Sequence, residues 1–153
     1  MAEKLARSYA RNLSYDALHL VVSQNLLPFL WRAGALGGRT FDVLMTNLPI
    51  KKLQERLDFA HSLHPESKTL GDFRAPEWLV RAETEALENA GKIITPHTEI
   101  ASLFAERANL LSWHLPKIQD PNPRAKNPKP VIVFPASTVG RKGVYELREA
   151  LRL

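Results

Sequence analysis

The chain has 153 residues, of which 44% are hydrophobic and 24% are charged. This balance excludes wholesale disorder, and the length fits one compact domain. The chain has no cysteine, which excludes disulfides, thiolate metal sites and cysteine nucleophiles. No run approaches the roughly 20 apolar residues of a membrane-spanning helix, and the first residues lack the apolar core of a secretory signal. We therefore expect a cytoplasmic protein.

The formal net charge of +5 is unevenly distributed along the chain. Residues 116–153 carry 8 Lys or Arg against 3 acidic residues, whereas residues 61–115 carry 5 against 8. The Lys and Arg side chains that could contact a phosphate-bearing partner are therefore concentrated in this last segment. Only Phe134 and Tyr145 supply aromatic rings there, so the segment lacks the interleaved aromatics of a nucleic-acid binder, and we expect no nucleic-acid partner.

The first segment has the spacing of a basic amphipathic helix. Leu5, Tyr9 and Leu13 share one helical face, and basic residues occupy another. This pattern predicts a surface helix. A peripheral contact with a membrane surface is the alternative, although such an anchor would need a broader apolar face.

Strand-like and helix-like segments then alternate along the chain. Apolar runs predict strands over 17–23, 41–46, 92–95 and 110–113. Apolar residues at helical spacing predict helices over 27–32, 49–61 and 76–90, and Thr95-Pro96 is expected to cap and open a further helix that buries Ile100, Leu103 and Phe104. This order predicts an α/β fold with a Rossmann-like, mostly parallel sheet and helices on both faces.

The chain changes character after this first unit. Residues 116–130 contain five of the 11 prolines, which predicts an extended linker after an N-terminal Rossmann-like domain over 1–115. Residues 131–153 then read as a strand, a loop and a helix over 144–151, which is too little to bury a core. We expect a fragment that holds the start of a second Rossmann-like domain; alternatively, the last strand folds back as an edge of the first sheet.

The loop between this last strand and its helix is the best candidate ligand site. It places two hydroxyls, glycines and two adjacent cations before a helix, a combination that suits a diphosphate: Ser137, Thr138, Gly140, Arg141, Lys142 and Gly143. The spacing matches neither a Walker loop nor the GxGxxG fingerprint. An ordinary basic loop explains the same residues equally well.

The histidines give weaker indications. His97 follows a predicted strand at its carboxyl end, where ligands of parallel sheets bind, and is also well explained as a surface residue. His61 and His64 have the spacing of helical metal ligands, but no carboxylate completes the set. We therefore expect no metal cofactor.

Two stretches resemble a known family. PVIVFPASTVGRKGVYELREAL resembles the opening of the nucleotide-binding C-terminal domain of group-one, or family-four, glycosyltransferases, and AETEALENAGKIITPHTEIASLF is similar to the end of their N-terminal domain. The resemblance implies the two-Rossmann-domain (GT-B) architecture and a retaining enzyme of cell-surface glycan or polysaccharide biosynthesis. Such an enzyme moves a sugar from a nucleotide-sugar donor to a glycan or lipid-linked acceptor.

The resemblance also implies roles for a few residues. Lys142 matches the lysine that contacts the donor diphosphate, and Thr95 and His97 correspond to the interdomain rim. Where the family often has another arginine, this chain reads Pro135-Ala136-Ser137-Thr138. Because the family's paired glutamates would lie beyond Leu153, we expect no sugar transfer by this chain alone. The alternative function is a small autonomous α/β module that binds a nucleotide or an anionic partner without catalysis.

Overall fold

The protein is built around one parallel β-sheet. The computed structural model describes residues 1–112, 132–133, 135 and 142–152. Within these residues the sheet has four strands: β1 (His19–Ser23), β2 (Thr40–Leu44), β3 (Ile93–Thr95) and β4 (Ala108–Leu110). They lie in the order β1-β2-β3-β4, and each neighbouring pair is parallel. The α/β class and the parallel, Rossmann-like sheet predicted from the sequence are confirmed.

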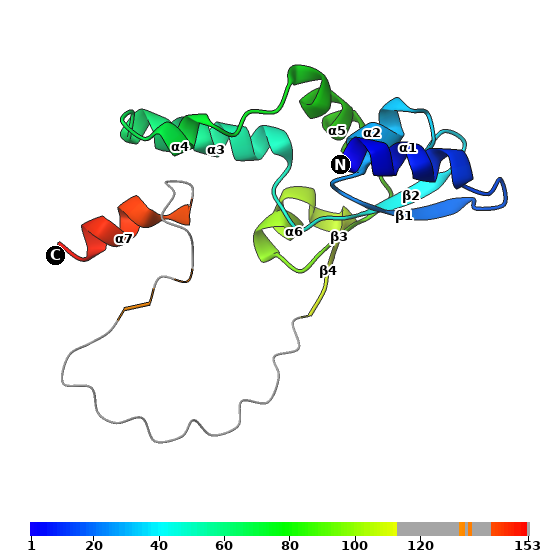
Figure 1. Ribbon diagram of the computed structural model, residues 1–153. Helices are drawn as coiled ribbons and strands as arrows, with labels where there is room; N and C mark the ends of the chain where they lie inside the picture. Colours follow the sequence, from blue (N-terminus) through cyan, green and yellow to red (C-terminus); the bar gives the residue numbers. More distant parts are fainter. Residues whose placement is uncertain (113–131, 134, 136–141, 153) are drawn as a thin grey trace, which may run out of the picture.

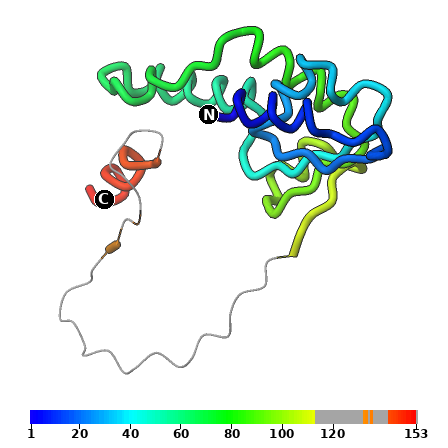
Figure 2. Tube along the Cα trace, turned by 45° about the vertical axis from the view of Figure 1, so that its right-hand side comes forward, coloured from blue at the N-terminus to red at the C-terminus, as the bar shows by residue number. Residues whose placement is uncertain are grey.

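Helices precede, connect and follow the strands (Figure 1). They are α1 (Ala2–Asn12), α2 (Leu27–Arg32), α3 (Ile50–Leu63), α4 (Lys68–Gly71), α5 (Glu77–Asn89), α6 (Thr98–Phe104) and α7 (Val144–Ala150), with a 3₁₀ turn over Ala105–Arg107. Helices α3 and α4 form a hairpin that extends away from the sheet (Figures 1 and 2). Within the described residues, no helix combines the length and the apolar character needed to cross a bilayer.

The core lies on one face of the sheet. Val22, Phe41, Val43 and Ile93 point to the same face and are at most 5% exposed. They form one cluster with buried residues of the surrounding helices, namely Ala6, Leu27, Leu30, Ala86, Leu87 and Ile100. Strands in sequential order with right-handed crossovers place their connecting helices on a common face. Helices α1, α2, α5 and α6 therefore all contribute to this one layer.

The alternate residues of the strands form the opposite face, which we call the open face. Val21 is 61% exposed and Leu44 is 37% exposed, and Ile94 beside Leu44 is half-buried. Among the residues that the structure describes, this face has no covering helix comparable to the layer on the first face. The expected second layer of helices is thus not found in the described part of the chain.

The structure differs most from the sequence-based predictions in the bounds of α6 and β4 and in the buried side of α1. Helix α6 begins at Thr98, with His97 as its cap, because Thr95 belongs to β3 and its hydroxyl accepts the His97 N–H at 3.2 Å. Strand β4 ends at Leu110, so the strand predicted over 110–113 is shifted toward the N-terminus. In α1, Ala6 is the buried residue, whereas Leu5 and Tyr9 are 47% and 52% exposed.

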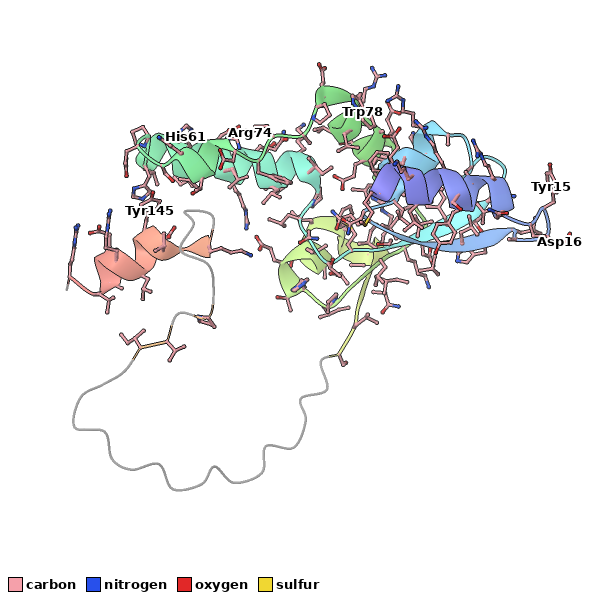
Figure 3. The ribbon with its side chains drawn as sticks, in the orientation of Figure 1. Tyr15, Asp16, His61, Arg74, Trp78 and Tyr145 are labelled. Carbon is pink, nitrogen blue, oxygen red and sulfur yellow. The ribbon has the colours of Figure 1, made fainter. Side chains whose placement is uncertain are left out.

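The C-terminal part is only partly described. The predicted linker 116–130 lies outside the described residues. Ile132 and Val133, predicted to belong to a strand, are exposed and have no strand conformation. The predicted final helix is α7, and its Tyr145 points toward the α3–α4 hairpin (Figure 3). There its ring stacks on His64 at 4.2 Å between centroids.

Candidate functional site

The carboxyl ends of the parallel strands form the candidate site. Ligands of open α/β sheets bind at this edge, because the loops that follow the strands expose polar groups there. A cavity of about 530 Å³ opens where β1 and β2 end, between α3 and α5. We call it the rim cavity, and its polar lining residues are Gln24, Asn25, Asn47, Glu83 and Lys142. This volume lies within the range of small-molecule sites.

A second hollow continues the same edge toward β3. Its volume is also about 530 Å³, and it is lined by Thr46, Pro96, His97, Thr98 and Glu99, among others. Asn47 and Leu48 line both spaces. The loop after β2 therefore forms the wall between them, and a ligand longer than one space can extend along the strand ends into the next.

A buried polar network holds this loop in place. Gln24 follows β1, and its amide Nε2 donates to Glu83 Oε1 at 3.1 Å and to the Leu48 carbonyl at 3.1 Å. The Asn47 N–H donates to Gln24 Oε1 at 3.2 Å, and the Ile50 N–H donates to Glu83 Oε2 at 2.5 Å. Three segments distant in sequence are thus joined at one carboxylate.

The network explains why a glutamate is tolerated in the core. Glu83 is 2% exposed, and an ionised carboxylate at such a position requires hydrogen-bond donors to both oxygens. Ile50 opens α3, where the first N–H groups have no partner within the helix. Glu83 supplies one of the missing acceptors from α5, so it fixes the start of α3 relative to the strand ends.

Burial raises the pKa of the Glu83 carboxyl above its ordinary value of 4.5, although the hydrogen bonds from Ile50 and Gln24 act in the opposite direction. A raised pKa means that the folded protein binds more protons than the unfolded chain between the two pKa values. In that interval, the stability contribution of Glu83 is greatest at low pH and decreases as the pH rises.

This direction gives a test with Glu83→Gln, which cannot ionise. We expect the free energy of unfolding of the wild type, minus that of the variant, to fall as the pH rises from about 4.5 through the raised pKa. Urea unfolding at several pH values between 4.5 and 8 measures it. A difference that stays constant over this range would show that the Glu83 pKa is not raised.

The structure locates the sequence-predicted site residues as follows. Ser137, Thr138, Gly140 and Arg141 lie outside the described residues. Lys142 lines the rim cavity. Gly143 adopts a left-handed conformation with φ of +82° as the cap of α7, a conformation that glycine accommodates without strain.

The two predicted rim residues take different positions. Thr95 is fully buried at 0% exposure in β3, where its hydroxyl organises the turn to His97. His97 lines the second hollow. The two residues therefore have different roles. Thr95 supports the turn from inside the protein, and His97 lies at the ligand-accessible edge.

An ion pair ties α3 to α6 beside the second hollow. The guanidinium of Arg56 on α3 contacts the carboxylate of Glu99 on α6. Both side chains are about half exposed, so the pair contributes little to stability. Its effect is to hold Glu99 over the edge of the hollow that it lines.

Several residues of the site were missed by the sequence analysis. Gln24 and Asn25 directly follow β1, and Asn47 follows β2, so the rule that ligands bind at strand ends could have indicated them. Glu83 lies four positions after Leu79 and four before Leu87, within the apolar stripe of the predicted helix. A carboxylate in such a stripe indicates a buried polar contact.

Within the described residues, no cluster of three His, Cys, Asp or Glu side chains is arranged to hold a metal ion. The site offers instead hydrogen-bonding amides, a buried carboxylate and a cation. Comparison with known proteins found no matching family model, no matching curated protein and no matching solved structure.

Proposed function

We propose that this chain forms the acceptor-side half of the sugar-transfer site of a nucleotide-sugar-dependent glycosyltransferase. The observation that carries the proposal is the position of Lys142. The family resemblance gives this lysine the role of contacting the donor diphosphate, and Lys142 lines the rim cavity at the ends of β1 and β2. The proposed donor contact and the strand ends of the first sheet thus border the same space.

The chemistry of the rim cavity agrees with this role. When a glycosyl bond to a nucleoside diphosphate breaks, negative charge develops on the departing diphosphate, and a nearby cation stabilises it. Lys142 supplies that charge. The amides of Asn25 and Asn47 border the same cavity and offer both donors and acceptors, which suits the hydroxyl groups of an acceptor sugar.

The proposal is tested by calorimetric titration of the chain with nucleoside diphosphates that carry different bases. We expect Lys142→Ala to lower the affinity for the preferred nucleotide at least about tenfold, since a charge-assisted hydrogen bond contributes about 1.5–3 kcal/mol. Lys92→Ala is the matched control. Lys92 is an exposed lysine that precedes β3 at the opposite, amino-terminal edge of the sheet, and its removal should leave the affinity unchanged.

Two results would contradict the proposal. One is the absence of nucleotide binding by the wild type, and the other is an equal loss of affinity in Lys142→Ala and Lys92→Ala. Inorganic diphosphate serves as a further probe. If it binds as tightly as every nucleoside diphosphate, the site recognises only the anion. The autonomous anion-binding module would then be the function that fits, in place of the glycosyltransferase.

A further inference from the structure

Strand β1 has an edge that pairs with no other strand in the described part of the chain. It ends the strand order and bonds only to β2. The backbone groups of Leu18 and Gln24 bond to β2, each at 3.0 Å. Because the bonding direction alternates from residue to residue along a strand, His19, Val21 and Ser23 direct their backbone polar groups away from β2.

An uncharged surface lies beside this edge. Helix α1 runs alongside β1 (Figures 1 and 2), and Tyr9 and Leu13 line a hollow of about 310 Å³ together with residues 20–23. Tyr9 is 52% exposed, Leu5 one turn earlier is 47% exposed, and Val21 is 61% exposed. We call the edge of β1 and the stripe of Leu5, Tyr9 and Leu13 the β1 edge surface.

The two ends of the sheet differ in how they resist pairing. Proteins protect free edges by keeping the edge strand very short or by placing Lys or Pro on it. β4, at one end of the described sheet, has only three residues. β1, at the other end, has five residues with the sequence HLVVS, which contains neither Lys nor Pro. The β1 edge is therefore the end of the sheet that is open to a further strand.

The charge distribution points to a second copy of this chain as the partner. With a net charge of +5, two copies repel each other unless they meet where the surface is uncharged. No charged side chain lines the hollow beside β1. The basic residues of α1 occupy another face of the helix, where Arg7 pairs with Glu3 at 2.6 Å. The β1 edge surface thus allows contact without bringing like charges together.

We propose that two copies of the chain associate through the β1 edge surface, with β1 antiparallel to the β1 of the other copy about a two-fold axis at Val21. Val21 then exchanges both backbone hydrogen bonds with Val21 of the other copy, and Ser23 pairs with His19 in the same way. The Ser23 carbonyl already accepts the Leu26 N–H at 2.9 Å, and its second lone pair accepts the His19 N–H. The two sheets become one continuous sheet, as in an isologous dimer.

Val21→Lys tests the centre of this interface. The position is exposed, so a lysine leaves the core unchanged but places two ammonium groups opposite each other at the axis. In sedimentation at increasing concentration, we expect the wild type to approach twice the 17.3 kDa of one chain. Val21→Lys should raise the dissociation constant of the dimer at least about tenfold, because juxtaposed like charges oppose association.

Leu44→Lys is the matched control. Leu44 shares the open face with Val21 but lies on β2, away from the edge, and is 37% exposed. The same charge at this position should leave the dissociation constant unchanged. Circular dichroism verifies that both variants keep the wild-type secondary structure.

Tyr9→Lys tests the helical part of the surface without altering the sheet. It should also weaken the dimer, since it places a charge within the apolar stripe of each copy. Ser8→Lys is its control, because Ser8 is an exposed neighbour on α1 outside the stripe.

Hydrogen exchange of the wild type identifies the paired edge directly. The Val21 N–H points away from β2, whereas the Val22 N–H points toward it. We expect the protection of the Val21 amide to rise more steeply with protein concentration than that of the Val22 amide, because only the second copy supplies an acceptor to Val21.

Four results would overturn the proposal. A wild type that stays monomeric would leave an extended segment of another protein as the candidate occupant of the edge. A dimer that Val21→Lys and Leu44→Lys weaken equally would lie on the open face instead. A dimer that Val21→Lys does not weaken, or one in which the Val21 amide gains no more protection than the Val22 amide, would use another surface.

Discussion

Replacing Glu83 by alanine is expected to lower the free energy of unfolding by about 3 kcal/mol at neutral pH. The substitution removes a carboxylate that is 2% exposed and accepts hydrogen bonds from Gln24 and Ile50. Each donor then loses its acceptor inside the protein, at a cost of about 1–3 kcal/mol for each unsatisfied group. Urea unfolding of the wild type and the variant measures the difference.

Glu88→Ala is the matched control for this prediction. Glu88 lies on the same helix and is exposed, so its replacement should change the stability by no more than about 0.5 kcal/mol. Equal effects of the two substitutions would show that the buried network contributes no stability of its own.

Hydrogen exchange adds a local readout for Glu83→Ala. The Ile50 N–H donates directly to Glu83, and the Asn47 N–H is held through Gln24. We expect these two amides to exchange faster in the variant than amides of β1, because the network holds the loop and not the strand. Unchanged protection at both amides would mean that the loop keeps its position without Glu83.

The sequence was sufficient to predict the elements that depend on local pattern. The strands β1, β2 and β3 and the helices α2, α3 and α5 were expected from their apolar spacing, since periodicity follows directly from backbone geometry. The start of α6 was predicted too early because Thr95-Pro96 has the composition of a helix start. Strand pairing nevertheless keeps Thr95 in β3.

The site depends on contacts that no local pattern contains. Gln24 and Glu83 are 59 positions apart in the sequence, and only the parallel arrangement of β1 and β2 brings the loops after them to the same carboxylate. The strand-end rule narrows the search to polar residues such as Asn25 and Asn47. It does not show which of these side chains form hydrogen bonds within the protein and which are available to a ligand.

The sequence of β2 contains a signal for the open face. A parallel strand covered on both faces is typically a continuous apolar run, whereas burial on one face produces alternation. β2 alternates, with exposed Thr40, buried Phe41, half-buried Asp42 and buried Val43. This alternation favours a single covered face, which is what the burial of the described residues shows.

One pair of adjacent isoleucines tests this one-sided burial directly. Ile93 is 0% exposed in the core, and Ile94 points to the open face and is half-buried. We expect Ile93→Ala to lower the free energy of unfolding by about 3–4 kcal/mol, because it leaves a cavity. The same substitution at Ile94 should cost only about 1 kcal/mol, since less apolar area returns to water.

The two substitutions remove the same atoms from neighbouring positions of one strand, so β-propensity changes equally and cancels in the comparison. Unfolding at two protein concentrations completes the experiment. If Ile94→Ala costs as much as Ile93→Ala, the open face is covered in solution. A cost that rises with protein concentration would then identify a second copy of the chain as the cover, because association stabilises the folded state by mass action.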